Sequence, residues 1–346
     1  MMGELSQRIG KKLEHYGNSI FEHLEWKILA QDVQIDCIRA AHKNAKSSDK
    51  KTHGVDILAG YYNPFTKRQE AFIIECKHRE WSNFIPSNLS LWVEELCNTI
   101  ECASTSPALT TYLEEYTLIG GILLYNSSDN IYEMERALKS ISQIKVPRRR
   151  HPLMIYLADN SRLEKWYSFN AEIAKIKQNS IENSFGIIYP SIGGSTWDRS
   201  PVVTPTYLFS DYILASYIKS ATNQGVTTKV DIKALFCFEH VTDDSLKYLQ
   251  DMITNQGITT KVDIKALFCF EHVTDDSLKY LRDMINELQL ESRSDRYQEV
   301  HFYFYPETEK DIDHIKDSFS KMFAGKDTFK YYLMDNRRLS RIYYES

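Results

Sequence analysis

The sequence has little of what marks several large classes of protein. No apolar run approaches the roughly 20 residues that a membrane-spanning helix requires, and the start MMGELSQRIGKK lacks the apolar core of a signal peptide. Glycine and proline, with 13 and 9 of 346 residues, are too scarce for a collagen-like or low-complexity chain. We therefore expect a globular protein with a cytoplasmic location and no membrane partner.

The motifs of several enzyme classes are also missing. The six cysteines form no CxxC pair and have no histidine at zinc-finger spacing, so the sequence disfavours a structural metal site and a disulfide framework. The 10 histidines supply no HxxxH on a convincing helix and no Ser/His/Asp pattern, and there is no P-loop for ATP. With a formal net charge of -5, the chain would need a local basic surface to bind nucleic acid.

The arrangement of apolar residues indicates an α/β protein with two domains. With 42% hydrophobic residues in 346, the chain has enough apolar surface for two cores. Residues 18–30 predict a helix with Phe21, Leu24, Ile28 and Leu29 on its core face, and 54–62 with 70–77 predict an antiparallel hairpin. Further helices are expected at 89–103, 129–142 and 161–177, and strands at 117–125, 153–158 and 184–189. The segment 190–206, rich in Gly, Ser, Thr and Pro, favours a boundary between domains 1–200 and 201–346.

The C-terminal part contains a tandem duplication. Residues 222–253 return almost unchanged as residues 254–285, with Ile258 in place of Val226 and Arg282 in place of Gln250. Each copy predicts one strand, KVDIKALFCFEH, followed by one helix. Both faces of that strand are apolar, so we expect both copies to lie in one sheet of a smaller α/β domain, which elements at 297–305, 307–323 and 327–334 complete. A recent natural duplication and an assembly artefact both explain the near-identity.

Three charged residues stand where the expected hairpin would bring them together. Asp56 lies in its first strand, and Glu75 and Lys77 end its second. Alternate residues of a strand share a face, so Glu75 and Lys77 point one way while Ile74 and Cys76 point the other. Two carboxylates from adjacent strands suit a hard cation such as Mg²⁺, and the main-chain carbonyl of Cys76 offers a further oxygen ligand. A lysine beside that ion can orient or deprotonate a water and offset charge on a phosphorane, which predicts phosphodiester hydrolysis.

This arrangement resembles the PD-(D/E)xK nuclease superfamily, the fold of many restriction enzymes, over about residues 17–105. The resemblance implies a restriction-endonuclease-like mixed sheet flanked by helices. It also implies an accessory acid from a Gly-xxx-Phe-Glu motif on the preceding helix, which Gly17, Phe21 and Glu22 match. Glu22 thus joins the trio as an expected catalytic residue. Val55 stands where the family name implies proline.

The resemblance further implies an enzyme, a metal-dependent deoxyribonuclease that uses Mg²⁺, with Mn²⁺ as an alternative ion. Its expected setting is restriction or another form of bacterial anti-phage defence. Its expected partners are DNA and either a second copy of the chain or a second protein, because one site per chain usually requires two chains to cut both strands of a duplex.

The sequence alone leaves alternatives open. The trio also fits a surface salt bridge on an edge hairpin, which would need no metal, and Glu25 competes with Glu22 as the accessory acid. A nuclease-like fold without activity, serving DNA binding or protein assembly, and an RNase on the same fold are rival functions. Arginines 148–150 form a candidate phosphate-contact patch, for which a solvated loop is an equal explanation.

Overall fold

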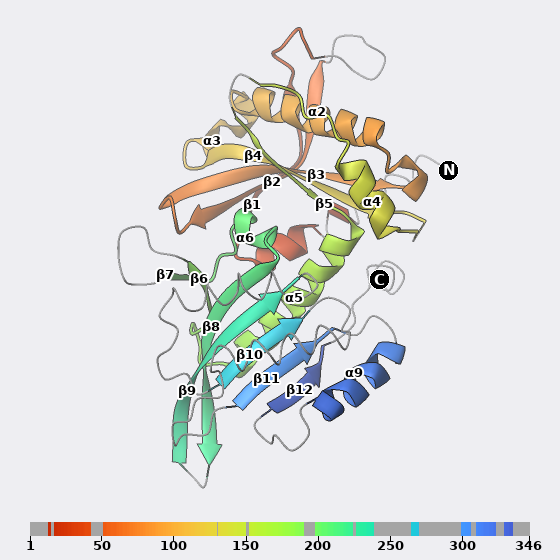
Figure 1. Cartoon of the computed structure of the whole chain (residues 1–346). Helices are drawn as coiled ribbons and strands as arrows, with labels where there is room; N and C mark the ends of the chain where they lie inside the picture. The colour runs from red at the N-terminus through yellow and green to blue at the C-terminus, as the bar shows by residue number, and fades with distance from the viewer. Residues whose placement is uncertain are drawn as a thin grey trace, which may run out of the picture. The chain divides into compact units, whose positions relative to one another are not determined.

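The computed structural model forms two compact units, which are Met1–Trp166 with Arg338–Ser346 and Tyr167–Arg337. It describes residues 13–14, 17–42, 51–129, 131–149, 152–189, 198–223, 226–238, 264–269, 299–305, 309–322 and 329–334. Each unit is built on a β-sheet of its own (Figure 1). The division between them falls inside α5 (Asn160–Asn179), ahead of the boundary that composition favours near residue 200.

The first unit contains, in its described part, a mixed sheet of five strands in the order β1-β2-β3-β4-β5. The pairs β1–β2 and β2–β3 are antiparallel, and the pairs β3–β4 and β4–β5 are parallel. This sheet and its flanking helices confirm the expected restriction-endonuclease-like fold class. The strands are β1 (Lys27–Asp36), β2 (Thr52–Asn63), β3 (Arg68–Arg79), β4 (Thr117–Ser127) and β5 (Met154–Ala158). The helices are η1 (Trp81–Asn83), α2 (Pro86–Ala103), η2 (Pro107–Leu109), α3 (Thr110–Leu113) and α4 (Met134–Ile141).

The expected hairpin is present as β2 and β3, and its turn explains its register. The Asn63 side-chain oxygen accepts hydrogen bonds from the backbone N–H groups of Phe65 and Thr66, at 2.9 and 3.3 Å. The buried Glu70 carboxylate accepts from Tyr61, Asn63 and Thr66 at 2.6 to 2.8 Å. The turn is therefore held at one end of the hairpin, while the candidate site lies at the other.

The helix expected over residues 18–30 ends earlier, and the prediction is wrong for its second half. Residues 17–23 are helical, but β1 begins at Lys27. Glu25 adopts a left-handed backbone conformation, with φ at 63°. Its backbone N–H donates a hydrogen bond to the carbonyl oxygen of Glu22, and the N–H of Trp26 donates to that of Phe21. The Phe21 and Trp26 rings pack with centroids 4.9 Å apart. This is a Schellman ending, which usually carries glycine at the position of Glu25, so the usual residue that marks the end of a helix is missing here.

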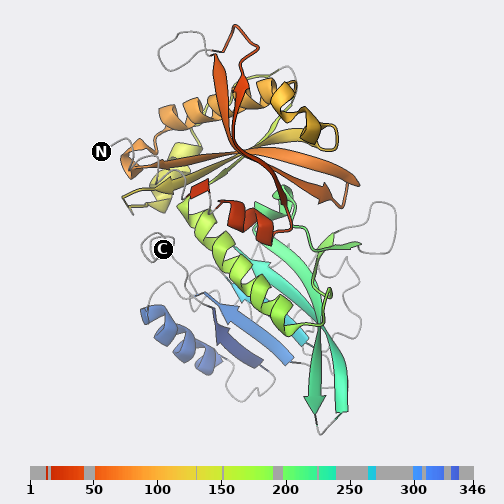
Figure 2. The same cartoon turned by 180° about the vertical axis from the view of Figure 1, so that it is seen from behind.

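Helices cover both faces of the first sheet (Figures 1 and 2). On one face, α2 packs Leu89, Val93 and Leu96 onto a core that includes Leu58 and Leu123. Gly121 of β4 permits this approach, because a Cβ there would lie 2.8 Å from a Leu96 methyl carbon. Helix 17–23 lies on the opposite face, where a Cβ on Gly17 would contact Leu124 and Ile57. The two faces therefore have separate helices and separate apolar clusters.

The second unit has, among its described residues, a sheet of seven strands in the order β12-β11-β10-β9-β8-β6-β7. Its first four strands are parallel, and β8, β6 and β7 are antiparallel to their neighbours. Because β6 and β7 pair in this sheet, these two strands belong with the C-terminal unit. Its elements are β6 (Gly186–Tyr189), β7 (Asp198–Ser200), α6 (Pro205–Leu208), β8 (Tyr212–Asn223), β9 (Val226–Cys237), β10 (Ile264–Cys269), β11 (Glu299–Phe304), α9 (Glu309–Met322) and β12 (Phe329–Leu333).

The strands of the two duplicated copies lie side by side, which confirms that both belong to one sheet. Strands β9 and β10 pair in parallel with Ile232 opposite Ile264 and Cys237 opposite Cys269, so each residue faces its own repeat. The helices expected in the two copies lie outside the described residues. No described helix of either unit is both long and apolar enough to cross a membrane.

Candidate active site

Asp56 lies in β2, beside the end of β3 that carries the other two predicted residues. The paired part of the hairpin ends with Ile57 opposite Ile74. Asp56 is the next residue beyond this pair, where the two strands diverge. Its Oδ2 accepts a hydrogen bond of 2.7 Å from the backbone N–H of Cys76. The main chain between Glu75 and Lys77 therefore holds the Asp56 carboxylate at the site.

Glu75 and Lys77 share one face of β3, as alternation predicts. The Lys77 Nζ donates to Glu75 Oε1 at 2.5 Å, and the two side chains are 13% and 14% exposed. Their parallel neighbours on β4 are Leu123 and Tyr125, which belong to the core beneath α2. A surface salt bridge would be solvated, whereas this pair is largely buried.

Glu95 is a member of the site that sequence reasoning missed. It projects from α2, and its Oε2 lies 3.8 Å from Lys77 Nζ. On the sequence alone Glu95 is one of several acids on an amphipathic helix, and only the packing of α2 on the sheet brings it to Lys77. The lysine therefore faces carboxylates from two different elements.

Burial and charge shift the pKa values of all three predicted residues. Burial raises the pKa of Glu75, an effect that Lys77 opposes and Asp56 reinforces. Burial also raises the pKa of Asp56, against the Cys76 N–H and Lys77, which lower it. For Lys77, burial acts to lower the pKa, but Glu75, Glu95 and Asp56 together raise it above its ordinary value. The lysine is therefore an ammonium at neutral pH.

The donor set fits a hard divalent cation. Burial makes both carboxyl groups costly to ionise, the charge of Asp56 adds to that cost for Glu75, and a bound cation offsets it. The Cys76 thiol is on the opposite face, where burial raises its pKa and the charges of Asp56 and Glu14 raise it further. Only the main-chain carbonyl of Cys76 is thus suited to join the carboxylates.

Glu22 does not join the trio in the described residues. Its side chain is exposed on helix 17–23, and no hydrogen bond or ion pair in the described part of the chain connects it to Asp56, Glu75 or Lys77. Glu25 is likewise exposed, in the turn that ends this helix. The N-terminal acid whose charge reaches β3 is Glu14, through its effect on Cys76. The role of Glu22 stays a prediction.

The residues after Lys77 have structural roles. Burial lowers the pKa of His78 to about 4, with Arg79 adding to the shift, so this imidazole is neutral at pH 7. Trp81 is 2% exposed and stacks on Phe84 with ring centroids 5.1 Å apart.

In the predicted arginine patch at residues 148–150, Arg149 forms an ion pair with Glu101 at 3.3 Å, and residue 150 lies outside the described residues.

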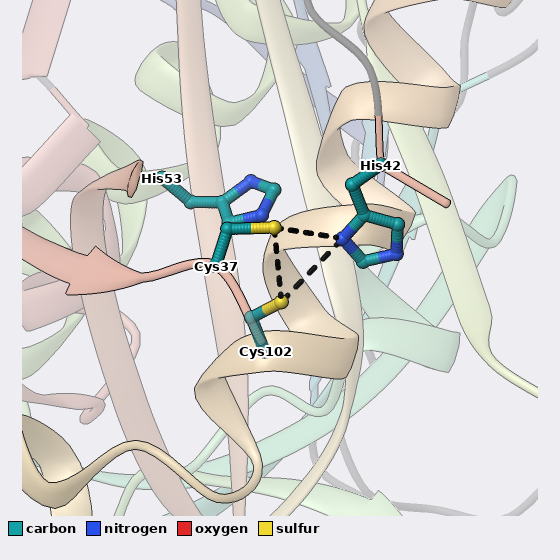
Figure 3. Close-up of side chains that lie close together, drawn as sticks. All are labelled: Cys37, His42, His53 and Cys102. Carbon is teal, nitrogen blue, oxygen red and sulfur yellow. Dashed lines mark hydrogen bonds between the residues drawn. The ribbon is translucent and has the colours of Figure 1, made fainter. Parts of the chain in front are cut away.

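A second group of chemically capable side chains lies elsewhere in the first unit. The sulfur and ring-nitrogen atoms of two cysteines and two histidines all lie within 4.8 Å of one another (Figure 3). Sequence reasoning disfavoured such a site because these residues have no compact spacing. Their fold brings them together from three segments, and we call them the Cys₂His₂ cluster: Cys37, His42, His53 and Cys102.

Comparison with known proteins concerns the first unit. Residues 1–162 match the family model described as the GAPS4 protein PD-(D/E)XK nuclease domain. The match covers all five strands of the first sheet together with Asp56, Glu75 and Lys77. No curated protein and no solved structure matches the chain.

Proposed function

We infer, from the match of residues 1–162 to the PD-(D/E)XK nuclease domain model, that this chain is a Mg²⁺-dependent deoxyribonuclease with its active site at the divergent end of β2 and β3. The observation that carries the proposal is the convergence of Asp56, Glu75 and Lys77 there, with Lys77 Nζ 2.5 Å from Glu75 Oε1. Asp56 and Glu75, with the carbonyl of Cys76, would hold the ion. Mn²⁺ has the same preference for oxygen ligands and is an alternative.

A bound Mg²⁺ would polarise the scissile phosphodiester and acidify a coordinated water. The protein's own contribution comes from Lys77. Its ammonium would donate hydrogen bonds to the attacking water and to phosphoryl oxygens, and it would offset the negative charge that accumulates on the phosphorane. Glu22, which the family motif suggests, would act as an accessory acid.

The test is cleavage of linear DNA, circular DNA and RNA by the full chain, with and without Mg²⁺. Lys77→Ala should lower the rate by at least about 10²-fold, the usual cost of removing one group that stabilises transition-state charge. Lys77→Gln keeps a hydrogen-bond donor beside the buried Glu75 and should lose activity with less risk to folding. Lys139→Ala, on the exposed face of α4, is the matched control and should cleave normally. Normal cleavage by both Lys77 variants would overturn the assignment.

The same assay decides between substrates and between functions. Cleavage of RNA but not DNA would favour the ribonuclease on this fold, and absence of cleavage under all conditions would favour a binding module. The family model concerns a protein of an anti-phage system, which supports a role in defence against foreign DNA.

We propose that the working form is a homodimer or a complex with a second protein. A duplex has two strands, and the described residues of each chain contain one trio of this kind. Sedimentation velocity of the chain, alone and with DNA, tests the homodimer, which a monomer under both conditions would contradict.

A further inference from the structure

The Cys₂His₂ cluster joins three parts of the first unit. Cys37 directly follows β1, His53 lies on β2 opposite Ile35 of β1, and Cys102 lies in the last turn of α2. His42 follows in the connection after β1. His42, His53 and Cys102 are 3%, 0% and 0% exposed and Cys37 is partly exposed, so three of the four ligands are enclosed rather than solvated.

Three of the four ligand atoms have the spacing of a tetrahedral zinc site, and a ring nitrogen of His53 lies within 4.8 Å of each of them. The Sγ atoms of Cys37 and Cys102 are 4.0 Å apart, and they lie 3.4 and 3.5 Å from Nδ1 of His42. Zinc–sulfur bonds of about 2.3 Å and zinc–nitrogen bonds of about 2.05 Å at tetrahedral angles place two sulfurs about 3.8 Å apart, and sulfur and nitrogen about 3.6 Å apart. The observed separations agree with these to within about 0.2 Å. Figure 3 shows both sulfurs and His42 Nδ1 turned toward one point.

The surroundings of His42 set the tautomer that zinc requires. Its Nε2 lies 3.2 Å from Glu101 Oε2, so that nitrogen carries the proton and donates to the carboxylate. Nδ1, which faces the sulfurs, then has its lone pair available. Arg149 holds Glu101 in turn, with 3.3 Å between Nη1 and Oε1, and it donates to Asn98 at 2.7 Å. A carboxylate behind a ligand histidine is a common second layer of zinc sites.

His53 is set in the same way by α2. The Thr99 hydroxyl donates its hydrogen to Glu95 O at 2.9 Å, so its oxygen is an acceptor toward His53 Nδ1 at 3.4 Å. This arrangement places the proton on Nδ1 and the lone pair on Nε2. Both histidines thus have the form in which an imidazole binds a metal.

We propose that the Cys₂His₂ cluster binds one structural Zn²⁺. Four protein ligands fill a tetrahedral coordination shell, which leaves no position for water or substrate and therefore distinguishes the site from a catalytic one. Binding transfers the two thiol protons to solvent and forms two zinc–thiolate bonds, with no change in oxidation state. The ion fastens the β1–β2 connection to the end of α2, the helix that also carries Glu95 to Lys77.

The test begins with the zinc content of the full chain, purified in reducing buffer. About one zinc per chain is expected by mass spectrometry of the metal. Cys102→Ser and His42→Ala should each abolish it, whereas Cys97→Ser, a buried cysteine on the same helix outside the cluster, should retain it. Asp56→Asn should also retain zinc, which separates this site from the proposed Mg²⁺ site. Cobalt in place of zinc should give the visible bands of tetrahedral coordination and a sulfur-to-cobalt charge-transfer band.

A measurement on the unaltered chain covers the case in which a variant fails to fold. Removing zinc with a chelator should lower the melting temperature, and Zn²⁺ but not Mg²⁺ should restore it. A reduced chain that binds neither Zn²⁺ nor Co²⁺ would overturn the proposal. So would a disulfide between Cys37 and Cys102 in a chain that takes up no metal after reduction, or undiminished zinc in the Cys102→Ser variant.

Discussion

At the scale of single residues, Asp56, Glu75 and Lys77 differ from surface charges because their side chains are largely buried and poorly solvated. Burial raises the pKa of both carboxyl groups, and the negative charge of Asp56 raises the pKa of Glu75 further. The ammonium of Lys77 compensates part of this cost. A site arranged in this way is costly for the folded chain without a cation and favourable with one, as expected for groups that serve a ligand rather than stability.

The variant Asp56→Asn tests the stability cost of the buried Asp56 carboxylate. Because the folded-state pKa of Asp56 is raised, its contribution to stability is present below the ordinary carboxyl pKa and is lost as pH rises through the raised value. At pH 7 without Mg²⁺ the variant should therefore be at least as stable as the unaltered chain, while its Mg²⁺ affinity falls at least about tenfold. Thermal denaturation in Mg²⁺-free buffer and calorimetric titration with Mg²⁺ measure the two effects.

The surface change Asp313→Asn on α9 is the control for Asp56→Asn and should alter neither quantity. Unchanged Mg²⁺ affinity in Asp56→Asn would move the metal site elsewhere. A marked loss of stability would show that the hydrogen bond from Cys76 needs the charged carboxylate, contrary to the pKa direction.

The sequence predicted the part of this site that depends on one hairpin. Alternation placed Glu75 and Lys77 on one face, because a strand has a fixed period of two residues. Strand alternation could not predict that Glu95 joins the site or that the Cys₂His₂ cluster forms. His42 and Cys102 are 60 residues apart, and they meet only because α2 packs across the sheet. Side chains from separate elements carry no spacing signal.

At the scale of elements, the same limit explains the helix that ended early. The period of 3.6 predicted a helix through residue 30, but a Schellman ending with Glu25 at φ 63° stops it and β1 takes over. The hairpin was predictable because its turn residues act locally, as the hydrogen bonds of Asn63 show. Turn chemistry is readable in sequence when the usual residue is present, and here glutamate stands where glycine is usual.

Glu25→Gly should therefore stabilise the chain by about 1 kcal/mol, because a left-handed backbone costs a residue with a Cβ about 1–2 kcal/mol. Glu22→Gly is the matched control, since it puts glycine inside the helix three positions earlier and should destabilise by about 1 kcal/mol. Denaturant titration of both variants tests the pair. Equal losses of stability would contradict the left-handed assignment at residue 25.

At the scale of the whole molecule, the chain has two units with separate sheets, and the duplication lies in the second. Strand β9 pairs with β8 and β10, and β10 pairs with β9 and β11. The segments that form the β9–β10 pair are identical from Ile232 to Cys237 and from Ile264 to Cys269. Apolar residues on both faces predicted that the two strands would share a sheet. The sequence could not give their order or register, which depend on the neighbouring strands.

This repetition makes one of the two copies removable. If residues 222–253 are deleted, the remaining strand presents to β8 the residues that β9 now presents, and to β11 the residues that β10 now presents. Only the β9–β10 pairing is lost, and no new sheet edge is created. The shortened chain should fold with a melting temperature within about 4 °C of the full chain, the shift that about 1 kcal/mol produces in a domain of this size. The proposed DNA cleavage should be unchanged, because Asp56, Glu75 and Lys77 lie in the other unit.

Deletion of residues 264–269 alone is the matched control for that experiment. It removes one strand but leaves the rest of its copy in the chain. Apolar surface that packs on this strand is then exposed to water, which costs about 25 cal/mol of stability per Å². This control should be poorly soluble, because uncovered apolar surface promotes aggregation. Soluble yield, melting temperature and DNA cleavage of both deletions decide the matter. If excision of the complete copy 222–253 were as damaging as excision of strand 264–269 alone, the two copies would have become interdependent, and the duplicated unit would be a required part of the fold.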